Sequence, residues 1–520
     1  MRKRKLIGVR YANSRQIWRA IVIGLVTGLV VSLFRLAIQA VLGGVKQAFA
    51  FFHQQPLWLL AWAAMMVLLG LALGNLAQRY PDIKGSGIPQ VEGQLTGQYD
   101  EEWWPVLWRK FCGGILAIGS GLYLGREGPS IQLGATVGQG ISEHGEVTPV
   151  ERRVGIASGA AAGLSAAFNA PIASTLFILE EVYHNFSPLV WLSVFISSLA
   201  ANLVSIQFFG LKPDLNVPHE TLFPLHQYWY LIGLGVLLGL LGRGYQLVVL
   251  RLGKWSRKIS WLKPTWYPVL ALLLLIPIAW WLPTTLGGGN ELIVKLNTLP
   301  ASVGLFLGLF VLRFVFSMIS YGTELPGGIF LPILSLGAVL GGLYCVILIN
   351  LHLVPQRYLA NYIIYAMAGY FACISKAPFT AILLITEMVG TMAHLMPLAV
   401  VAVIAYLVVD ALNGAPVYAA MLANFMHKQP ARPLVGLTQM TTTIFTGAPL
   451  EGVKIKDYPW PTGSLILMIY RGDGEVIPHG QTTLQAGDTL LIQLTGPKAA
   501  SYQRQLRQAA GQGQEKGANG

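Results

Sequence analysis

Long apolar runs separated by short polar segments fill most of the chain and predict a bundle of membrane helices. A helix of about 20 apolar residues is long enough to cross the hydrocarbon core of a bilayer. The first half carries such runs at 21–40, 57–76, 109–123, 131–141, 154–168 and 189–209. The second half carries them at 229–250, 266–282, 301–320, 333–349, 362–373, 378–389 and 395–412.

Three interruptions of this pattern place glycines one to four residues before a proline, around Ser86, Glu127 and Phe330. Because proline suits the first position of a helix, each interruption predicts a helix that begins inside the apolar region. Unpaired N–H groups and the positive end of the helix dipole then face the preceding loop. Irregular backbone at membrane depth survives only where it lines protein or a water cavity. We therefore expect the three helix starts to converge on a site that attracts anions.

Glu127 introduces a carboxylate into a segment that otherwise appears membrane-buried. Ionisable residues at that depth are costly and are candidates for function. The carboxylate could occupy the anion position at the helix start and leave it on protonation, or when a mobile anion competes. The alternative is a helix-terminal ion pair with Arg126.

An internal repeat divides the apolar region into two halves. The segment Leu133-Gly134-Ala135 recurs 203 residues later, and an Ala-Pro pair followed nine residues on by a glutamate recurs 207 residues later, ending at Glu180 and at Glu387. Duplicated halves with broken helices are typical of transporters whose site lies near the midplane. Glu181 corresponds to Met388 in the second half, so this carboxylate occurs in one half only. A structural role is therefore less expected for Glu181 than for Glu180.

From about residue 434 the pattern changes to short alternating runs. Residues 464–470 and 489–494 predict β-strands, with turns between them. We expect a small cytoplasmic domain at 434–500 and a flexible Gly/Gln-rich tail at 501–520.

Composition and charge support a polytopic membrane protein. Apolar residues make up 54% of the chain and charged residues 11%, which excludes an ordinary soluble protein. The net charge of +13 is explained by membrane topology rather than by nucleic acid, because the basic segment 1–20 contains no acidic residue. Both termini are therefore expected in the cytoplasm. The first apolar run is too long for a secretory signal and is treated as a retained span.

Other functional classes find little support in the sequence. No nucleophile–base pair stands out in the sequence, so we do not expect an enzyme. No metal-ligand spacing stands out either, so we expect no metal and no cofactor apart from transported ions. The acidic and tryptophan-rich segment 100–104 is expected at the membrane interface. A sensor that uses the membrane part only as an anchor remains an alternative, although it explains the three helix starts poorly.

Four motifs in order, 85–89, 125–129, 328–332 and 415–418, give the chain a close resemblance to the CLC family of chloride channels and proton-coupled chloride transporters. The resemblance implies an all-α polytopic membrane domain at 21–430 with two inverted repeats of broken and tilted helices, at about 21–211 and 227–426. It also implies a homodimer with a separate pathway in each subunit, located in the cell membrane.

Site residues follow from the same resemblance. Ser86 and Tyr418 would supply hydroxyls to a central chloride ion, the backbone N–H groups of Ile329 and Phe330 would complete its shell, and Glu127 would be the external gating glutamate. Glu181 resembles the internal proton-accepting glutamate of the exchangers. It favours chloride/proton antiport, with a passive chloride channel as the alternative.

The C-terminal domain resembles the TrkA-C subdomain of regulators of potassium transport, on residues 477–480 followed by Gly487 and Asp488. The resemblance implies a small-molecule ligand and a regulatory role. The alternative is a cap that assists folding or stabilises a dimer. The expected partners of the whole chain are thus chloride, protons, membrane lipid and a second copy, without nucleic acid.

Overall fold

The computed structural model describes residues 2–145, 147–184, 187–211, 213, 215, 223–256, 263–426, 438–471, 474–494 and 499–511. The chain divides into two compact units. The larger covers residues 1–96 and 100–425, and the smaller covers 97–99 and 426–520. The larger unit carries the apolar helices, and the smaller one carries the β-sheet.

The helices of the first half account for the apolar runs up to residue 209. They are α1 (Arg2–Phe52), α2 (Trp58–Arg79), α3 (Ile88–Leu95), α4 (Trp103–Gly119), α5 (Glu127–Glu143), α6 (Pro149–Phe168), α7 (Pro171–Phe177) and α8 (Pro188–Phe209). Between α7 and α8 lies a π-helical turn, η2 (Ile178–Val182). Short helices such as α3 and α7 are the broken elements that the glycine and proline pattern predicts.

The second half repeats this order of long and short helices. It contains α9 (Tyr228–Ser256), α10 (Tyr267–Trp281), α11 (Asn290–Lys295), α12 (Val303–Gly322), α13 (Phe330–Asn350), α14 (Leu359–Ser375), α15 (Pro378–Val389), α16 (Leu395–Ala411) and α17 (Val417–Met426). Helices α9 to α16 correspond in order to α1 to α8, and α17 follows as an addition.

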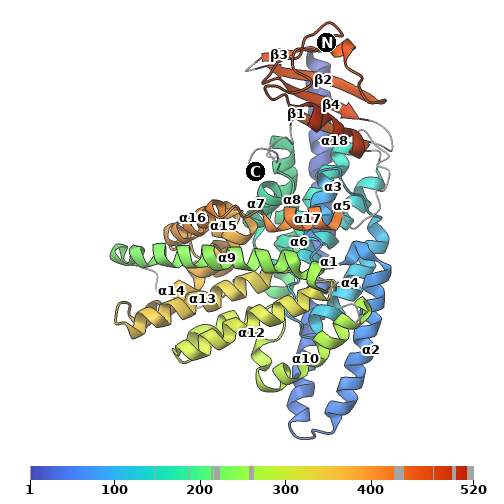
Figure 1. Cartoon of the computed structure of the whole chain (residues 1–520). Coiled ribbons are helices and arrows are strands. Elements are labelled where there is room, and N and C mark those ends of the chain that lie inside the picture. The colour runs from blue at the N-terminus through green and yellow to red at the C-terminus, as the bar shows by residue number, and fades with distance from the viewer. Residues whose placement is uncertain are drawn as a thin grey trace. The chain divides into compact units, whose positions relative to one another are not determined.

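Helix packing repeats with the sequence and confirms the internal duplication. Helix α5 packs on α6 as α13 packs on α14, α6 packs on α8 as α14 packs on α16, and α1 packs on α8 as α9 packs on α16. Figure 1 shows α13 and α14 side by side within the second half. At the junction of the halves, Gly125 and Gly328 exchange backbone hydrogen bonds of 2.7 Å in both directions, in an antiparallel bridge. These two glycines are 203 residues apart, so each bonds its counterpart in the other repeat, as an inverted arrangement requires.

Burial within the larger unit separates spanning helices from central ones. Among the described residues, eight helices are long and apolar enough to cross a membrane. Helix α14 is completely buried within the protein, whereas α2 buries only about a fifth of its most apolar window. The central position of α14 and α6 leaves α1, α2, α9 and α12 with large exposed apolar side chains, as expected for surfaces that face lipid.

The three helix starts differ from the prediction in one detail. Proline was expected at the first helical position, but α3 begins one residue earlier, at Ile88, and α5 and α13 begin two residues earlier, at Glu127 and Phe330. Proline lacks only an N–H group that would be unpaired anywhere in the first turn, so all three positions suit it. The correction matters because it places Glu127 and Phe330 at the first positions of their helices.

The smaller unit forms a four-stranded antiparallel sheet with one helix. The strands are β1 (Thr438–Thr443), β2 (Ser464–Arg471), β3 (Gly474–Val476) and β4 (Thr489–Leu494), in the order β1-β4-β2-β3. Sequence pattern predicts β2 and β4 correctly and misses β1, whose residues are mostly threonine, and the three-residue β3. The start of the domain predicted at residue 434 lies outside the described residues.

The predicted flexible tail at 501–520 is wrong for its first part. Residues Ala499–Ala509 form α18, and Leu506 and Ala510 are fully buried against the sheet. The backbone N–H of Phe445 donates a hydrogen bond to the Ala510 carbonyl and so holds the end of this helix. Glycine and glutamine dominate the composition of this segment and hide the few apolar positions that the core uses. Residues 512–520 lie outside the described part.

Candidate functional site

The starts of α3 and α5 meet at Ser86 and Gly128. A Cβ atom built on Gly128 would lie 2.2 Å from the Ser86 Oγ, so only glycine allows this approach. Gly87 has φ = 92°, which carries the chain from the Ser86 loop into α3. The glycines of the two motifs therefore bring the Ser86 hydroxyl against the first turn of α5.

Glu127 lies at the first position of α5 and its side chain is fully buried. The carboxylate folds back over its own loop, where a Cβ atom on Gly125 would lie 2.4 Å from Oε2. The Nε atom of Arg126 is 3.8 Å from Oε1, too far for a hydrogen bond. It is within ion-pair distance, so the Arg126 ion pair considered as the alternative is present beside the convergence of the helix starts. The side chain faces the helix starts rather than lipid or solvent.

Helix α13 contributes the third start. The Gly125–Gly328 bridge holds the loops before α5 and α13 together. The first turn of α13 is closed by the bond from the Ile333 N–H to the Ile329 carbonyl, so the N–H groups of the preceding residues have no acceptor within the helix. The Phe330 ring packs 4.3 Å from the ring of Phe371, which fixes the helix start among aromatic side chains.

Tyr418, at the start of α17, closes the site from the other side. Its ring lies 6.0 Å from that of Phe177, which in turn packs 5.6 Å from Phe330. The hydroxyl is buried and interacts electrostatically with both Glu127 and Glu181. Among the described residues, neither the Tyr418 Oη nor the Ser86 Oγ has a hydrogen-bond partner. Two buried hydroxyls are thus available as donors.

Glu180 and Glu181 are neighbours with different surroundings. The Glu180 carboxylate accepts hydrogen bonds from the backbone N–H (2.9 Å) and the hydroxyl (2.6 Å) of Thr380, at the start of α15. Glu387 does the same for α7, accepting from the N–H groups of Ile172 (3.2 Å) and Ala173 (2.8 Å). We call these contacts the reciprocal caps. Each half therefore caps a helix of the other half with its repeated glutamate.

Glu181 has no such partner in the scaffold. It is 96% buried, and its Oε1 has no hydrogen-bond partner within the described part of the chain. Its nearest electrostatic partners include Glu92 on α3 and Glu180. The distinction expected from the repeat is thus visible in the contacts: the duplicated glutamates bind helix starts, and the unduplicated one does not.

One functional residue was missed by the sequence reasoning. Lys110 on α4 is fully buried, and its Nζ donates to the carbonyls of Ile83 (2.9 Å) and Gly85 (2.8 Å). These bonds hold the loop that carries Ser86. A lysine inside the apolar run 109–123 was the available signal, because a cation there requires buried acceptors.

Glu101, in the segment expected at the membrane interface, is buried between helices, which the sequence pattern did not predict. Its carboxylate accepts from the Gln132 Nε2 at 3.0 Å, and the Gln132 side chain also touches Gly87, next to Ser86. Burial, together with the charge of Asp82, raises the pKa of Glu101 to about 8.

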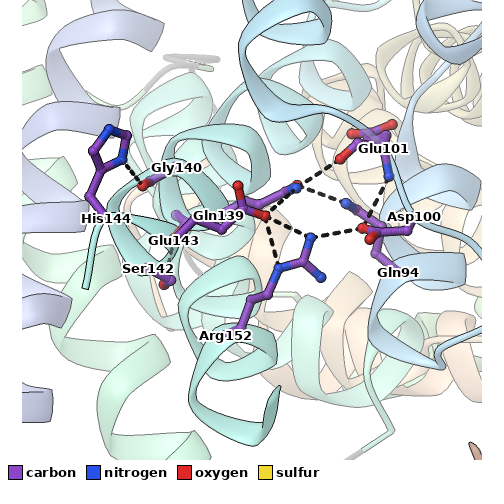
Figure 2. A network of polar contacts seen from close by, with 10 residues as sticks. Gln94, Asp100, Glu101, Gln139, Gly140, Ser142, Glu143, His144 and Arg152 are labelled. Atoms are coloured by element: carbon purple, nitrogen blue, oxygen red, sulfur yellow. Dashed lines mark hydrogen bonds and ion pairs between the residues drawn. The ribbon is translucent and has the colours of Figure 1, made fainter. Parts of the chain in front are cut away.

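A chain of polar side chains extends from Glu101 to the end of α5. Gln139 donates to the Glu101 carbonyl (2.7 Å) and to Glu143 (2.9 Å), and accepts from Gln94 (2.8 Å). Figure 2 shows Gln139 at the centre of these bonds, with Arg152 reaching from α6 to Glu143 and Asp100. The network ties α3, α5 and α6 together beside the loop of Ser86.

The structure thus brings Ser86, Glu127, Ile329, Phe330 and Tyr418 into one region, as the motifs predict, and places Glu181 within electrostatic reach of Tyr418. The model of the family described as "Voltage gated chloride channel" matches residues 69–410. The chain belongs to the CLC family of voltage-gated chloride channels. A second match, to the TrkA-C domain, covers residues 443–507, which include β2, β3, β4 and most of α18.

Curated relatives within the CLC family cover most of the chain. The H(+)/Cl(-) exchange transporter ClcA of Yersinia pseudotuberculosis serotype IB is 33% identical over 431 residues, which are 79% of this chain and 87% of the relative. The protein of the same name from Salmonella typhimurium is 33% identical over 437 residues, covering 80% and 89%.

Solved structures of CLC proteins agree with this architecture. A slow cyanobacterial Cl-/H+ antiporter superposes with a TM-score of 0.75 at 30% identity, covering 80% of this chain and 99% of that one. A eukaryotic CLC transporter superposes with a TM-score of 0.68 at 20% identity, over 84% and 77% of the two chains, which supports the fold alone.

Proposed function

We propose that the chain is a proton-coupled chloride transporter that exchanges chloride for protons across the cell membrane, with a separate pathway in each subunit of a homodimer. Membership of the CLC family and similarity to named chloride/proton exchangers support this proposal. The observation that carries it is the fully buried Glu127 carboxylate at the convergence of the α3, α5 and α13 starts.

The anion site would be built from partial charges. Chloride must lose its hydration shell in a narrow pathway, and hydroxyl and N–H donors replace that shell without holding the ion as tightly as a lysine or arginine would. The buried hydroxyls of Ser86 and Tyr418 and the N–H groups of Ile329 and Phe330 are the donors that we assign to a chloride ion. The site requires no cofactor or metal beyond the transported ions.

Glu127 and chloride would compete for the helix starts. The ionised carboxylate satisfies the positive end of the α5 dipole, and protonation removes that attraction. A chloride ion can then take the position that the carboxylate leaves. Because the two anions exclude one another, binding of a proton and binding of chloride become coupled.

Glu181 would carry protons between the cytoplasm and this site. It is buried, has a carboxylate oxygen with no hydrogen-bond partner among the described residues, and acts electrostatically on Tyr418. Glu180 is less suited to this role, because its hydrogen bonds to the N–H and hydroxyl of Thr380 hold the start of α15. We assign the internal proton transfer to Glu181 for this reason.

The assembly and orientation follow the same proposal. Ile172 and Phe379 are repeat counterparts next to the reciprocal caps and are largely exposed apolar residues, which suits a face between two copies. We propose that both termini are cytoplasmic, in keeping with the basic N-terminal segment. The match of residues 443–507 to the TrkA-C domain supports a regulatory small-molecule ligand there.

The decisive experiment reconstitutes the protein in vesicles and imposes a chloride gradient without a pH gradient. An antiporter moves protons against their own gradient as chloride runs down, whereas a passive channel moves chloride without uphill proton movement. Proton transport that follows the chloride gradient supports the proposal. Chloride flux with no linked proton movement would replace it with the channel alternative.

A further inference from the structure

Tyr321 lies at the end of α12, between the two elements that carry the proposed anion-binding hydroxyls. Its hydroxyl donates to the Sδ atom of Met421 at 3.4 Å. Met421 is one helical turn beyond Tyr418 on α17, so the bond anchors the helix that presents the Tyr418 hydroxyl.

The same hydroxyl also touches the loop of Ser86. A Cβ atom built on Gly85 would lie 3.3 Å from the Tyr321 Oη, and the backbone N–H of Ser86 faces this oxygen. A phenol has one proton to donate and lone pairs that accept. Donation to Met421 therefore leaves the Tyr321 oxygen free to accept from the Ser86 N–H. In this way the one hydroxyl links the Ser86 loop to α17.

Other bonds hold the Ser86 loop to the segment that follows Tyr321. Gly85 donates to the Glu324 carbonyl (3.2 Å) and accepts from the Gly327 N–H (3.0 Å), and Lys84 pairs with the Glu324 carboxylate at 2.8 Å. This side of the site is thus firmly fixed by several backbone contacts. The hydroxyl of Tyr321 extends the fixed assembly to α17.

We propose that Tyr321 is a positioning residue that sets the separation of the Ser86 and Tyr418 hydroxyls. The inference rests on the proposed chloride transport and adds a residue that neither binds the anion nor carries protons in that scheme. Two donors grip one anion well only at the right separation, because hydrogen-bond strength falls steeply with distance and angle. Loss of the Tyr321 hydroxyl should therefore weaken chloride binding and speed chloride release.

Tyr321→Phe tests this proposal with the aromatic ring retained. We expect the dissociation constant for chloride, measured by calorimetry on the purified protein, to rise several-fold. Chloride turnover in vesicles should increase, while the ratio of protons to chloride stays at its wild-type value because the Tyr418 hydroxyl is retained along with Glu127 and Glu181. Met421→Leu removes the acceptor with little change of volume and should shift affinity and turnover in the same direction.

The double variant and a matched control separate positioning from general packing. Because Tyr321→Phe already breaks the bond that Met421→Leu removes, the Tyr321→Phe/Met421→Leu protein should bind chloride no more weakly than Tyr321→Phe alone. Tyr344→Phe deletes a comparable phenol bond, to the Tyr230 carbonyl at 2.9 Å, and should keep wild-type affinity.

Wild-type chloride affinity and turnover in Tyr321→Phe, or additive losses in the double variant, would overturn the proposal. The outcome is distinguishable from failure of the transport function itself. In that case the wild-type protein would neither bind chloride nor move protons in response to a chloride gradient.

Discussion

At the scale of single residues, the proposed anion site depends on hydroxyl donors that are buried without a hydrogen-bond partner among the described residues. Ser86 and Tyr418 were identified from their motifs, and their hydroxyls lie unbonded beside the helix starts within the described structure. Lys110 bonds the carbonyls of the Ser86 loop, and Tyr321 bonds Met421 on α17. The spacing of residues in the sequence does not reveal these contacts. Motifs thus identify the residues assigned to the proposed anion site, but not those that hold them in place.

Tyr418 provides the first residue-scale prediction. Tyr418→Ala removes one hydroxyl from the proposed chloride shell, and a hydrogen bond to a charged group contributes about 1.5–3 kcal/mol. We expect the dissociation constant for chloride to rise at least about tenfold, together with fewer protons moved per chloride ion. Isothermal titration calorimetry measures the affinity, and Tyr344→Ala serves as control. Unchanged affinity would remove Tyr418 from the site.

Glu101 provides a prediction on pH. Burial holds its pKa near 8 in the folded protein, against 4.5 for an ordinary glutamate. Between these values the folded state binds a proton that the unfolded state releases, so the free energy of unfolding falls as pH rises. The slope for one group is at most about 1.4 kcal/mol per pH unit.

The expected observation is a melting temperature that falls from about pH 5 to about pH 8 in wild type and less steeply in Glu101→Gln. The exposed neighbour Glu102 provides the control, since Glu102→Gln leaves the buried carboxylate in place. Parallel melting curves for wild type and Glu101→Gln over this range would show that Glu101 does not titrate there.

At the scale of elements, the two halves hold each other together through their helix starts. Sequence repetition predicted the existence of corresponding helices and distinguished Glu181 from Glu180. It did not predict that the duplicated glutamates cross between the halves, because a linear pattern does not say which helix start a carboxylate will reach. The sequence likewise did not predict that Gly125 pairs with Gly328, because this contact forms only when the two halves pack together.

The reciprocal caps lead to the element-scale prediction. Glu387→Gln replaces two charge-assisted bonds to the first turn of α7 with weaker neutral ones. We expect a loss of about 1–2 kcal/mol in stability, seen as a lower melting temperature of the purified protein. Asp410→Asn, which removes an exposed carboxylate paired with Lys376, should change it little. Equal melting temperatures for Glu387→Gln and wild type would show that the cap contributes nothing.

At the scale of the whole molecule, composition and apolar pattern were enough for the class of the fold. The membrane unit, its duplication and the separate sheet domain were all predicted. The burial of Glu101 between helices was not predicted, and the predicted flexible tail was wrong because α18 packs its few apolar residues although its segment is rich in glutamine. Tertiary contacts decide such positions, and a single sequence carries little trace of them.

In the proposed mechanism, transport by the whole molecule depends on the alternation of Glu127 and chloride at the start of α5. Glu127→Gln keeps the shape of the side chain and removes its charge and its capacity to release a proton. The direct test is the reversal potential of reconstituted Glu127→Gln under a combined chloride and pH gradient. We predict that the potential follows the chloride gradient alone, whereas that of wild type depends on both gradients. A reversal potential that still shifts with pH in Glu127→Gln would contradict the proposed gate.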